Sequence, residues 1–252
     1  GGDGTMLGAA RAMAAYKVPV IGINAGRLGF ITDIVLEDMN RLLPAMLLGQ
    51  YVADERSMLE GSVWREGNML FEGLAVNDIG ISHGRALGMV EYTVYVDGLQ
   101  MAVQRADGVL VSTSTGSTAY AMAAGGPIMH PSVSSMLLVP IAPHTLSNRP
   151  IVLGSHTKID IEVNETRSAV ASFDAQVLID VQAARQSKQR ALHHASPGRL
   201  QPLRFATPQA QVELPAAIRT SDSHTLAGSD HAGSDSSSDN LRKIVRLTFQ
   251  PI

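Results

Sequence analysis

Hydroxyl-bearing residues gather in one short block of the sequence, residues 112–118, which is interrupted only by Gly116. The apolar run 109–111 before the block is typical of a buried strand, because β-branched side chains fit a pleated core. The small residues 119–124 after it indicate a helix, whose start Ser117 or Thr118 can cap. Free N–H groups at such a start, together with hydroxyl donors, form a cradle for phosphate or ribose oxygens. An ordinary Ser/Thr turn is the alternative for this block taken alone.

A second candidate for chemistry is the glycine-rich stretch 1–5, which reads Gly-Gly-Asp-Gly-Thr. Its three glycines predict a turn whose backbone can take positive φ and approach a ligand closely. Asp3 stands among them without a bulky neighbour, so its carboxylate can reach a bound group. A structural Asx hydrogen bond is the alternative for a single aspartate in a turn.

The first fifty residues alternate helix and strand patterns. Residues 6–17 predict a helix and residues 18–23 a buried strand, and a second glycine-rich turn, 24–30, ends that strand. An amphipathic helix is expected over 36–48. In open α/β sheets, ligands collect at the carboxyl ends of strands, where both glycine-rich turns would lie. The pattern predicts a partial Rossmann-like α/β nucleotide-binding domain over residues 1–52.

Short strand patterns with regular turns follow from about Tyr51. Asp97-Gly98 is a strong hairpin signal, because this pair tolerates the positive φ of a type I′ turn. The predicted strands cover residues 57–65, 69–76, 89–96, 99–105, 136–139, 151–153, 158–163 and 169–173. The fold class is therefore α/β plus all-β, with a β-rich, sandwich-like domain over residues 53–182.

The composition changes again over residues 183–252. Ser, Asp, Gly and His dominate residues 222–240, and such a segment cannot bury enough apolar area to offset its chain entropy. We expect this tail to be mostly disordered, with a strand only at 244–249.

Bulk composition narrows the function classes. The formal net charge is -3 and 45% of residues are hydrophobic, so no basic surface favours nucleic acid or an anionic membrane. Cysteine is absent, which excludes disulfides and thiolate metal sites. No signal peptide and no apolar run of membrane-spanning length is found. We expect a soluble, cytoplasmic protein.

Taken in order, the motifs resemble those of the NAD kinase family. The matching segments are residues 1–5 (GGDGT), 24–30 (NAGRLGF), 77–78 (ND), 107–120 (DGVLVSTSTGSTAY), 124–127 (AGGP) and 143–150 (PHTLSNRP). The resemblance runs from Gly1 to about Gln182, with Ser114 in place of a family proline. Lipid kinases and phosphofructokinases share the GGDG turn, but the TGSTAY and PHTLSNRP segments distinguish NAD kinases from them.

This resemblance implies transfer of the γ-phosphoryl of ATP, or of polyphosphate, to the 2′-hydroxyl of the adenosine ribose of NAD. A ribose hydroxyl is a poor nucleophile, so a carboxylate must accept its proton, and the resemblance gives that role to Asp3. Arg105 and Asp107 are expected to contact the dinucleotide partly from a neighbouring subunit. The residues expected to bind NAD are Asp3, Gly4, Asn77, Asp78, Arg105, Asp107, Thr115, Gly116, Ser117, Thr118, Ala119, Tyr120 and Gln176.

The resemblance also implies partners. Mg²⁺ is expected to arrive with ATP rather than to occupy a standing protein site, and the scattered histidines show no ligand spacing. Self-association as a dimer or tetramer through the β-rich domain is expected.

Both ends of the chain depart from the family pattern. The glycine-rich turn normally follows a strand, so the natural N-terminus is expected upstream of Gly1. Reading permitted codons for residues 194–214 one base later can give THPPDDYSHFASLRRKLKWN, which resembles the family ending. We therefore expect a frameshift, in the gene or in the sequence as read, between about Gln182 and His194. Two alternatives to an active kinase stay open: an inactive dinucleotide-binding or assembly protein, and a GGDG-type lipid kinase.

Overall fold

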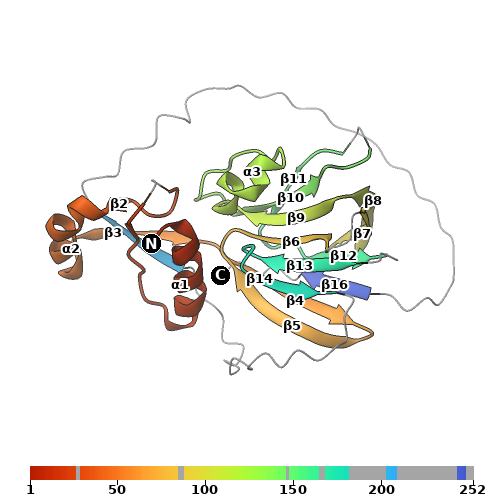
Figure 1. Cartoon of the computed structure of the whole chain (residues 1–252), viewed down its shortest axis with the longest axis horizontal. Helices are drawn as coiled ribbons and strands as arrows, with labels where there is room; N and C mark the ends of the chain where they lie inside the picture. The colour runs from red at the N-terminus through yellow and green to blue at the C-terminus, as the bar shows by residue number, and fades with distance from the viewer. Residues whose placement is uncertain are drawn as a thin grey trace.

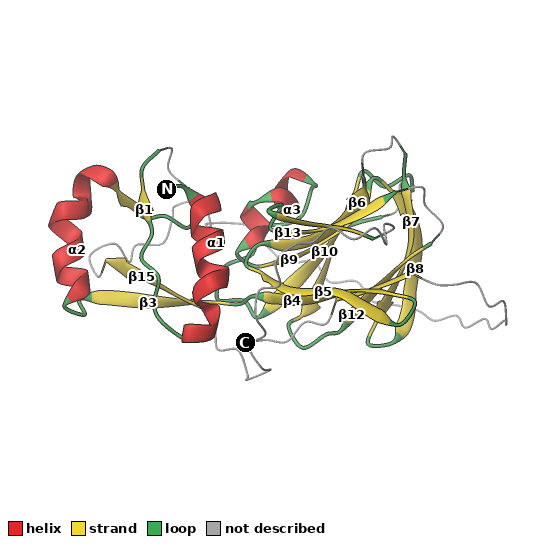
Figure 2. Ribbon diagram, turned by 60° about the horizontal axis from the view of Figure 1, so that its bottom comes forward, coloured by secondary structure: helices red, strands yellow, loops and turns green. Residues whose placement is uncertain are grey.

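The computed structural model describes residues 1–26, 29–84, 88–145, 148–164, 168–181 and 203–208, and the backbone of a strand at 243–247. We call residues 1–56 with 203–208 the N-terminal part, and residues 59–181 with 243–247 the β-rich part. The two parts lie side by side, with α1 (Asp3–Met13) between the rest of the N-terminal part and the strands (Figures 1 and 2).

The β-rich part is built from two main sheets and a hairpin. One sheet has six strands in the order β11-β10-β9-β6-β13-β14, and the other has four in the order β16-β12-β7-β8. The first contains β6 (Asp78–His83), β9 (Gly108–Thr113), β10 (Ser135–Ile141), β11 (Ile151–Gly154), β13 (Ala169–Phe173) and β14 (Val177–Asp180). The second contains β7 (Val90–Val96), β8 (Leu99–Ala106), β12 (Ile159–Val163) and β16 (Lys243–Leu247). The hairpin pairs β4 (Leu59–Arg65) with β5 (Asn68–Ala75).

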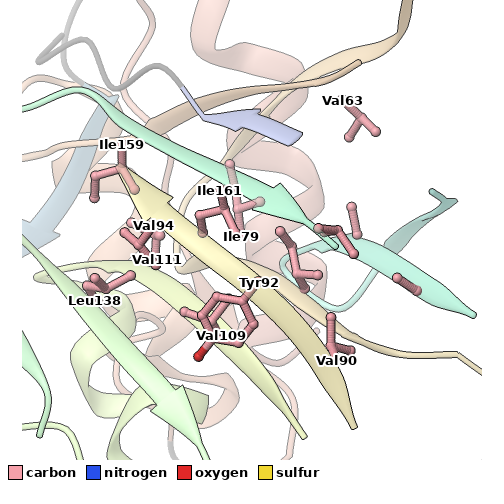
Figure 3. Close-up of a cluster of buried hydrophobic side chains, with 14 of the residues drawn as sticks. Val63, Ile79, Val90, Tyr92, Val94, Val109, Val111, Leu138, Ile159 and Ile161 are labelled. Atoms are coloured by element: carbon pink, nitrogen blue, oxygen red, sulfur yellow. The ribbon is translucent and has the colours of Figure 1, made fainter. Parts of the chain in front are cut away.

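One hydrophobic core joins these sheets. It combines side chains of the six-stranded sheet, such as Ile79 and Val111, with side chains of the four-stranded sheet, such as Tyr92 and Ile161. Figure 3 shows these side chains gathered in one layer. Strand β9 is buried at every position, which explains the apolar run 109–111 at its centre. The two sheets therefore pack face to face as one sandwich, and β9 is an inner strand of the six-stranded sheet.

The N-terminal part is smaller and less regular. It contains α1, the one-turn helix η1 (Ala14–Tyr16), β1 (Ile23–Asn24), β2 (Ile34–Val35), η2 (Leu36–Asp38), α2 (Met39–Leu47), β3 (Tyr51–Arg56) and β15 (Leu203–Pro208). β1 pairs with β2 in parallel, and β15 pairs antiparallel with β3. The Val20 amide donates to the Arg204 carbonyl at 2.8 Å, and the Ala206 amide donates to the Val20 carbonyl at 3.1 Å.

The predicted architecture of an α/β part followed by a β-rich part is confirmed, with local corrections. Gly1–Thr5 is not a free turn, because α1 begins at Asp3. The strand expected over 18–23 shrinks to β1 and the Val20 bridge. Five strands of the described chain were not predicted: β2, β3, β6, β14 and β15. The hairpin at Asp97-Gly98 is present, with φ of 51° and 82°.

The structure also differs from the predicted disordered tail and from the predicted domain boundary. Strand β15 contains buried Leu203 and Phe205, so the predicted disorder is wrong for residues 203–208. The strand expected at 244–249 is present as β16, and the remaining residues of the tail lie outside the described chain. The predicted boundary between residues 52 and 53 falls inside β3. Among the helices that the structure describes, none has the length and apolar character to cross a membrane.

Candidate active site

Asp3 occupies the first turn of α1 and is held by the chain segment that precedes β2. Its Oδ2 accepts the Phe30 amide at 2.8 Å, and its Oδ1 accepts the Ile31 amide at 3.4 Å and the Thr32 hydroxyl at 3.0 Å. An acidic side chain in a first helical turn is also favoured by the partial positive charge of the helix N-terminus. The carboxylate is therefore fixed by three donors from one turn.

Gly29 explains how this turn comes so close to the carboxylate. A Cβ added at Gly29 would lie 2.0 Å from the Asp3 Oδ1 atom, so only glycine leaves room for the carboxylate. The second glycine-rich turn, whose residues 27–28 lie outside the described chain, therefore packs on the first.

Asn77 and Asp78 lie where β5 ends and β6 begins, next to a buried carboxylate. The Asp174 side chain accepts the amides of Val76, Asn77 and Asp78 at 3.0, 2.7 and 3.2 Å. Burial and the neighbouring Asp174 charge raise the pKa of Asp78 to about 7. The buried Asn77 Oδ1 has no hydrogen-bond partner among the described residues.

The hydroxyl block forms a tight turn whose hydroxyls mostly bond the protein itself. Thr113 Oγ1 donates to the Val76 carbonyl at 2.7 Å and accepts the Gly116 amide at 2.9 Å. A Cβ at Gly116 would lie 2.1 Å from the Asn77 carbonyl oxygen, so this turn is pressed against Asn77. The hydroxyl block and the Asn77-Asp78 pair therefore pack directly against each other.

The predicted helix cap is wrong. Helix α3 (Tyr120–Ala123) has Ala119 as its N-cap residue and no side-chain cap. Ser117 Oγ instead donates to the Ser114 carbonyl at 2.6 Å and accepts the Met129 amide at 2.9 Å. Ser117 is fully buried, so it supports the turn, and its predicted contact with a dinucleotide gains no support. Thr118 Oγ1 donates to the Thr115 carbonyl at 3.1 Å, and the Tyr120 side chain is exposed.

Helix α1 packs against the residue that precedes the Asn77-Asp78 pair. Its buried side chains Met6, Leu7 and Ala10 pack in one cluster with Val76 and Phe205; we call this the seam cluster, and its other buried members are Ala14, Met58 and Leu203. The cluster reaches Val76, the residue immediately before Asn77. It therefore sets how far Asp3 lies from the Asn-Asp pair.

Charged groups also meet near Asp3. The pKa of Asp33 is raised overall. Burial is the largest cause, the charges of Asp54 and Asp3 also raise it, and the Arg56 charge lowers it. Arg56 pairs with Asp54 and donates through Nη1 to the Thr115 hydroxyl at 3.4 Å. Arg56 thus reaches from β3 to the hydroxyl block.

Arg105 and Asp107 are not brought to this site. They precede β9, whereas the hydroxyl block follows it, and a six-residue strand separates them by roughly 20 Å. Arg105 is exposed, and its carbonyl accepts the His144 amide at 3.2 Å. Their predicted contact with a dinucleotide bound at Asp3 within the same chain is therefore not supported.

Sequence reasoning missed several residues of the site. Thr32, Arg56, Asp174 and Arg11 were not singled out as functional, although all four contact predicted site residues. Asp174 stands two positions before Gln176, which the resemblance did select. The three backbone donors that surround it are visible only in three dimensions.

Comparisons with known proteins identify the class of this fold and site. Residues 1–51 match the family model described as ATP-NAD kinase N-terminal domain, and residues 76–193 match the ATP-NAD kinase C-terminal domain. The NAD kinase of Cupriavidus pinatubonensis is 56% identical over 178 residues, which cover 71% of this chain and 58% of that protein. The NAD kinase of Delftia acidovorans is 49% identical over 195 residues, covering 77% and 65%. The chain spans about three fifths of the length of the curated relatives it matches.

Solved structures agree. A crystal structure of yeast NADH kinase complexed with NADH has a TM-score of 0.69 and 26% identity, covering 82% of this chain and 59% of that one. An NAD kinase from Archaeoglobus fulgidus in complex with ATP has a TM-score of 0.60 and 25% identity, covering 83% and 76%. The chain belongs to the NAD kinase family. The alternative of a GGDG-type lipid kinase is not supported.

Proposed function

We propose that this chain transfers the γ-phosphoryl of ATP to the 2′-hydroxyl of the adenosine ribose of NAD, giving NADP, with Asp3 as the general base. The observation that carries the proposal is the placement of Asp3. Its carboxylate is fixed at the start of α1 by three donors, and α1 is packed against the residue before Asn77.

The hydrogen bonds of Asp3 fix its carboxylate and leave one acceptor position open. A carboxylate offers about four lone-pair positions, and the turn at 30–32 uses three of them. One position is therefore left to accept the proton of a ribose hydroxyl as that oxygen attacks phosphorus. The fixed geometry lowers the entropy cost of aligning base and hydroxyl.

The surroundings suit a dinucleotide. A Cβ at Gly4 would meet only Gln176 Nε2, at 3.6 Å, so the protein's own packing does not require glycine there, and close approach of a ligand is a reason for it. The unpartnered Asn77 Oδ1 is an acceptor for a ribose hydroxyl or an adenine amino group. The Phe30 ring is 66% exposed beside Asp3 and offers a surface that a base can cover.

The phosphoryl donor needs its charge neutralised. Mg²⁺ bound with ATP supplies this, and such an ion uses one or two protein carboxylates together with phosphate oxygens. The Asp3 charge contributes to the raised pKa of Asp33, so the two carboxylates lie within electrostatic reach of each other. Among the described residues, no group of three or more His, Cys, Asp or Glu side chains could hold a metal ion. Arg56 is a nearby cation for donor phosphates. Polyphosphate as an alternative donor and a cytoplasmic location stay predictions.

Assembly follows from the position of Arg105 and Asp107. Because they lie at the end of β9 away from the hydroxyl block, a dinucleotide bound to a second copy is the contact that we propose for them. The neighbouring edge strand β8 exposes Leu99, Met101 and Val103, an apolar row suited to self-association. We propose a dimer or tetramer formed through the β-rich part.

The test compares the unchanged chain with Asp3→Asn, assayed for NADP⁺ formation from NAD⁺ and Mg·ATP. Removal of a general base lowers kcat by roughly 10²–10⁴-fold. Equal activity in both proteins would rule out Asp3 as the base. No activity in either, with NAD⁺ still raising the melting temperature, would identify an inactive dinucleotide-binding protein.

A further inference from the structure

Gln176 contacts α1 through both ends of its amide. Its Nε2 donates to the Gly4 carbonyl at 2.7 Å, and its Oε1 accepts Arg11 Nη2 at 2.5 Å. Gly4 follows Asp3 directly, and Arg11 lies two helical turns further along the same helix. The sequence predicts a dinucleotide contact for Gln176, and each polar end of its side chain makes one bond to α1, which leaves one Nε2 hydrogen and one Oε1 lone pair unused by these two bonds.

Arg11 continues the connection inward. Its Nη1 pairs with Asp174 Oδ2, whose side chain is fully buried, whereas the Arg11 side chain is 17% exposed. The same Asp174 carboxylate accepts the three consecutive amides of residues 76–78. One guanidinium therefore joins the helix that carries Asp3 to the backbone that carries Asn77 and Asp78.

The turn between β13 and β14 is shaped for this role. Asp174 and Ala175 both have positive φ, 50° and 53°, which directs the Asp174 carboxylate inward and the Gln176 amide toward α1. The Asp174 amide donates to the Asp78 carbonyl at 2.9 Å, so the turn is also bonded to β6. A left-handed pair of non-glycine residues is costly and persists only where the surroundings fix it.

We propose that Arg11, Asp174 and Gln176 form a clamp that positions Asp3 against the Asn77-Asp78 pair. The inference rests on the proposed kinase function. The clamp joins the N-terminal part to the β-rich part at the one place where the base and the predicted ribose-binding residues must share a geometry. Small misplacement of a base costs rate steeply, roughly 10²-fold for about 1 Å.

The test uses Gln176→Leu and Arg11→Met, assayed for kcat and for the KM of NAD⁺. Gln176 is exposed, so its replacement leaves the fold intact. A clamp predicts that kcat falls roughly 10–100-fold in both variants, while in Arg11→Met the KM and the Kd of NAD⁺ stay within about twofold. Unchanged kcat in both variants, with a raised KM in Gln176→Leu, would make Gln176 a dinucleotide contact alone and overturn the clamp.

Two further variants separate the clamp from loss of folding. Gln176→Glu keeps the acceptor for Arg11 and loses only the donor to Gly4, so its kcat falls less than that of Gln176→Leu. The double variant Arg11→Met, Gln176→Leu falls little further than either single variant, because the two residues act as a unit. Fully additive losses would contradict this. Arg41→Met is the matched control, since Arg41 pairs with Asp38 on the exposed face of α2.

Hydrogen exchange tests the clamp without any activity. The amides of residues 76–78 donate to Asp174, so Arg11→Met speeds their exchange, whereas Arg41→Met does not. If the unchanged chain makes no NADP⁺ but the exchange result holds, the proposed function fails and the clamp stands. If the chain is active and every clamp variant keeps full kcat and protection, the clamp is wrong.

Discussion

The two parts of the molecule bury their apolar side chains in different ways. The β-rich part has a large core, contributed by nearly all its strands, with its buried members at 0–3% exposure, and a smaller cluster around Leu110, Leu137 and Val139. Among the described residues, the N-terminal part has the seam cluster and a second small cluster around Ile34, Met46 and Ala206. Its helix α2 leaves Leu47 72% exposed, and its strands β1 and β2 have two residues each.

This difference indicates that the β-rich part supplies most of the stability, whereas the N-terminal part supplies the proposed base. The β-rich part holds Asn77, Asp78 and the hydroxyl block at the ends of buried strands, so these groups share a rigid frame. The N-terminal part brings Asp3, and it meets the frame through the seam cluster and the clamp. A substitution in the seam cluster should therefore lower kcat more than it lowers the free energy of unfolding.

The largest effect is expected when one buried leucine is truncated in each part. Leu138→Ala in the sandwich core is expected to lower the free energy of unfolding by about 3–5 kcal/mol, and Leu7→Ala in the seam cluster by about 2–3 kcal/mol. Leu138 lies in the larger core, where the walls cannot collapse into the cavity. Urea denaturation followed by circular dichroism measures both. A larger loss for Leu7→Ala would reverse the ranking of the two parts.

A pair of glycines gives a sharper contrast of about 1–3 kcal/mol. Gly116→Ala places a Cβ 2.1 Å from the Asn77 backbone oxygen, so it should lower stability. Gly29→Ala places a Cβ 2.0 Å from the Asp3 side chain, so it should displace the base and lower kcat with a smaller loss of stability. Gly154→Ala is the control, because its nearest atom would be 3.8 Å away. Unchanged kcat in Gly29→Ala would show that Asp3 tolerates displacement.

The smallest effect concerns the pH dependence of the frame. The raised pKa of Asp78, about 7, means that the folded state holds a proton that the unfolded state has already lost. Stability from this group is therefore full below about pH 4 and is lost as the pH rises toward 7. Between about pH 5.5 and 7 the loss is roughly 1–2 kcal/mol. Asp78→Asn should remove this slope in urea titrations, and Asp38→Asn should keep it.

Sequence patterns predicted the parts of the fold that depend on local signals. Strand β9 was recognisable from its apolar run, and β7 and β8 from the Asp97-Gly98 turn between them. Strand β6 was missed because Asn77-Asp78 reads as a turn and Gly80 weakens a strand pattern. The structure explains Gly80, since a Cβ there would lie 2.7 Å from the Leu110 side chain.

The site was predictable only as a set of motifs. The family resemblance selected Asp3, Asn77, Asp78, Thr115 and Gly116, which the structure places around α1, the start of β6 and the end of β9. It could not give their connections. The contact of Arg11 with Asp174 joins positions 163 residues apart, and no local pattern reports a buried ion pair of that separation. Arg105 and Asp107, which were predicted to contact the dinucleotide partly from a neighbouring subunit, lie at the end of β9 away from the hydroxyl block.

Strand β15 also sets an order of assembly during synthesis. Thr207 bonds the Val52 carbonyl, 155 positions earlier in the chain, and the strand lies between β3 and Val20. At the usual ~5–20 residues per second, a ribosome needs roughly 8–30 s to make the intervening chain. For that time the edge of β3 and the inner face of α1 lack their partners, while the sandwich can already condense. The part that carries the base therefore closes late, with only β16 of the β-rich part made after β15. Until then the open edge of β3 is a place where unwanted strand pairing can start.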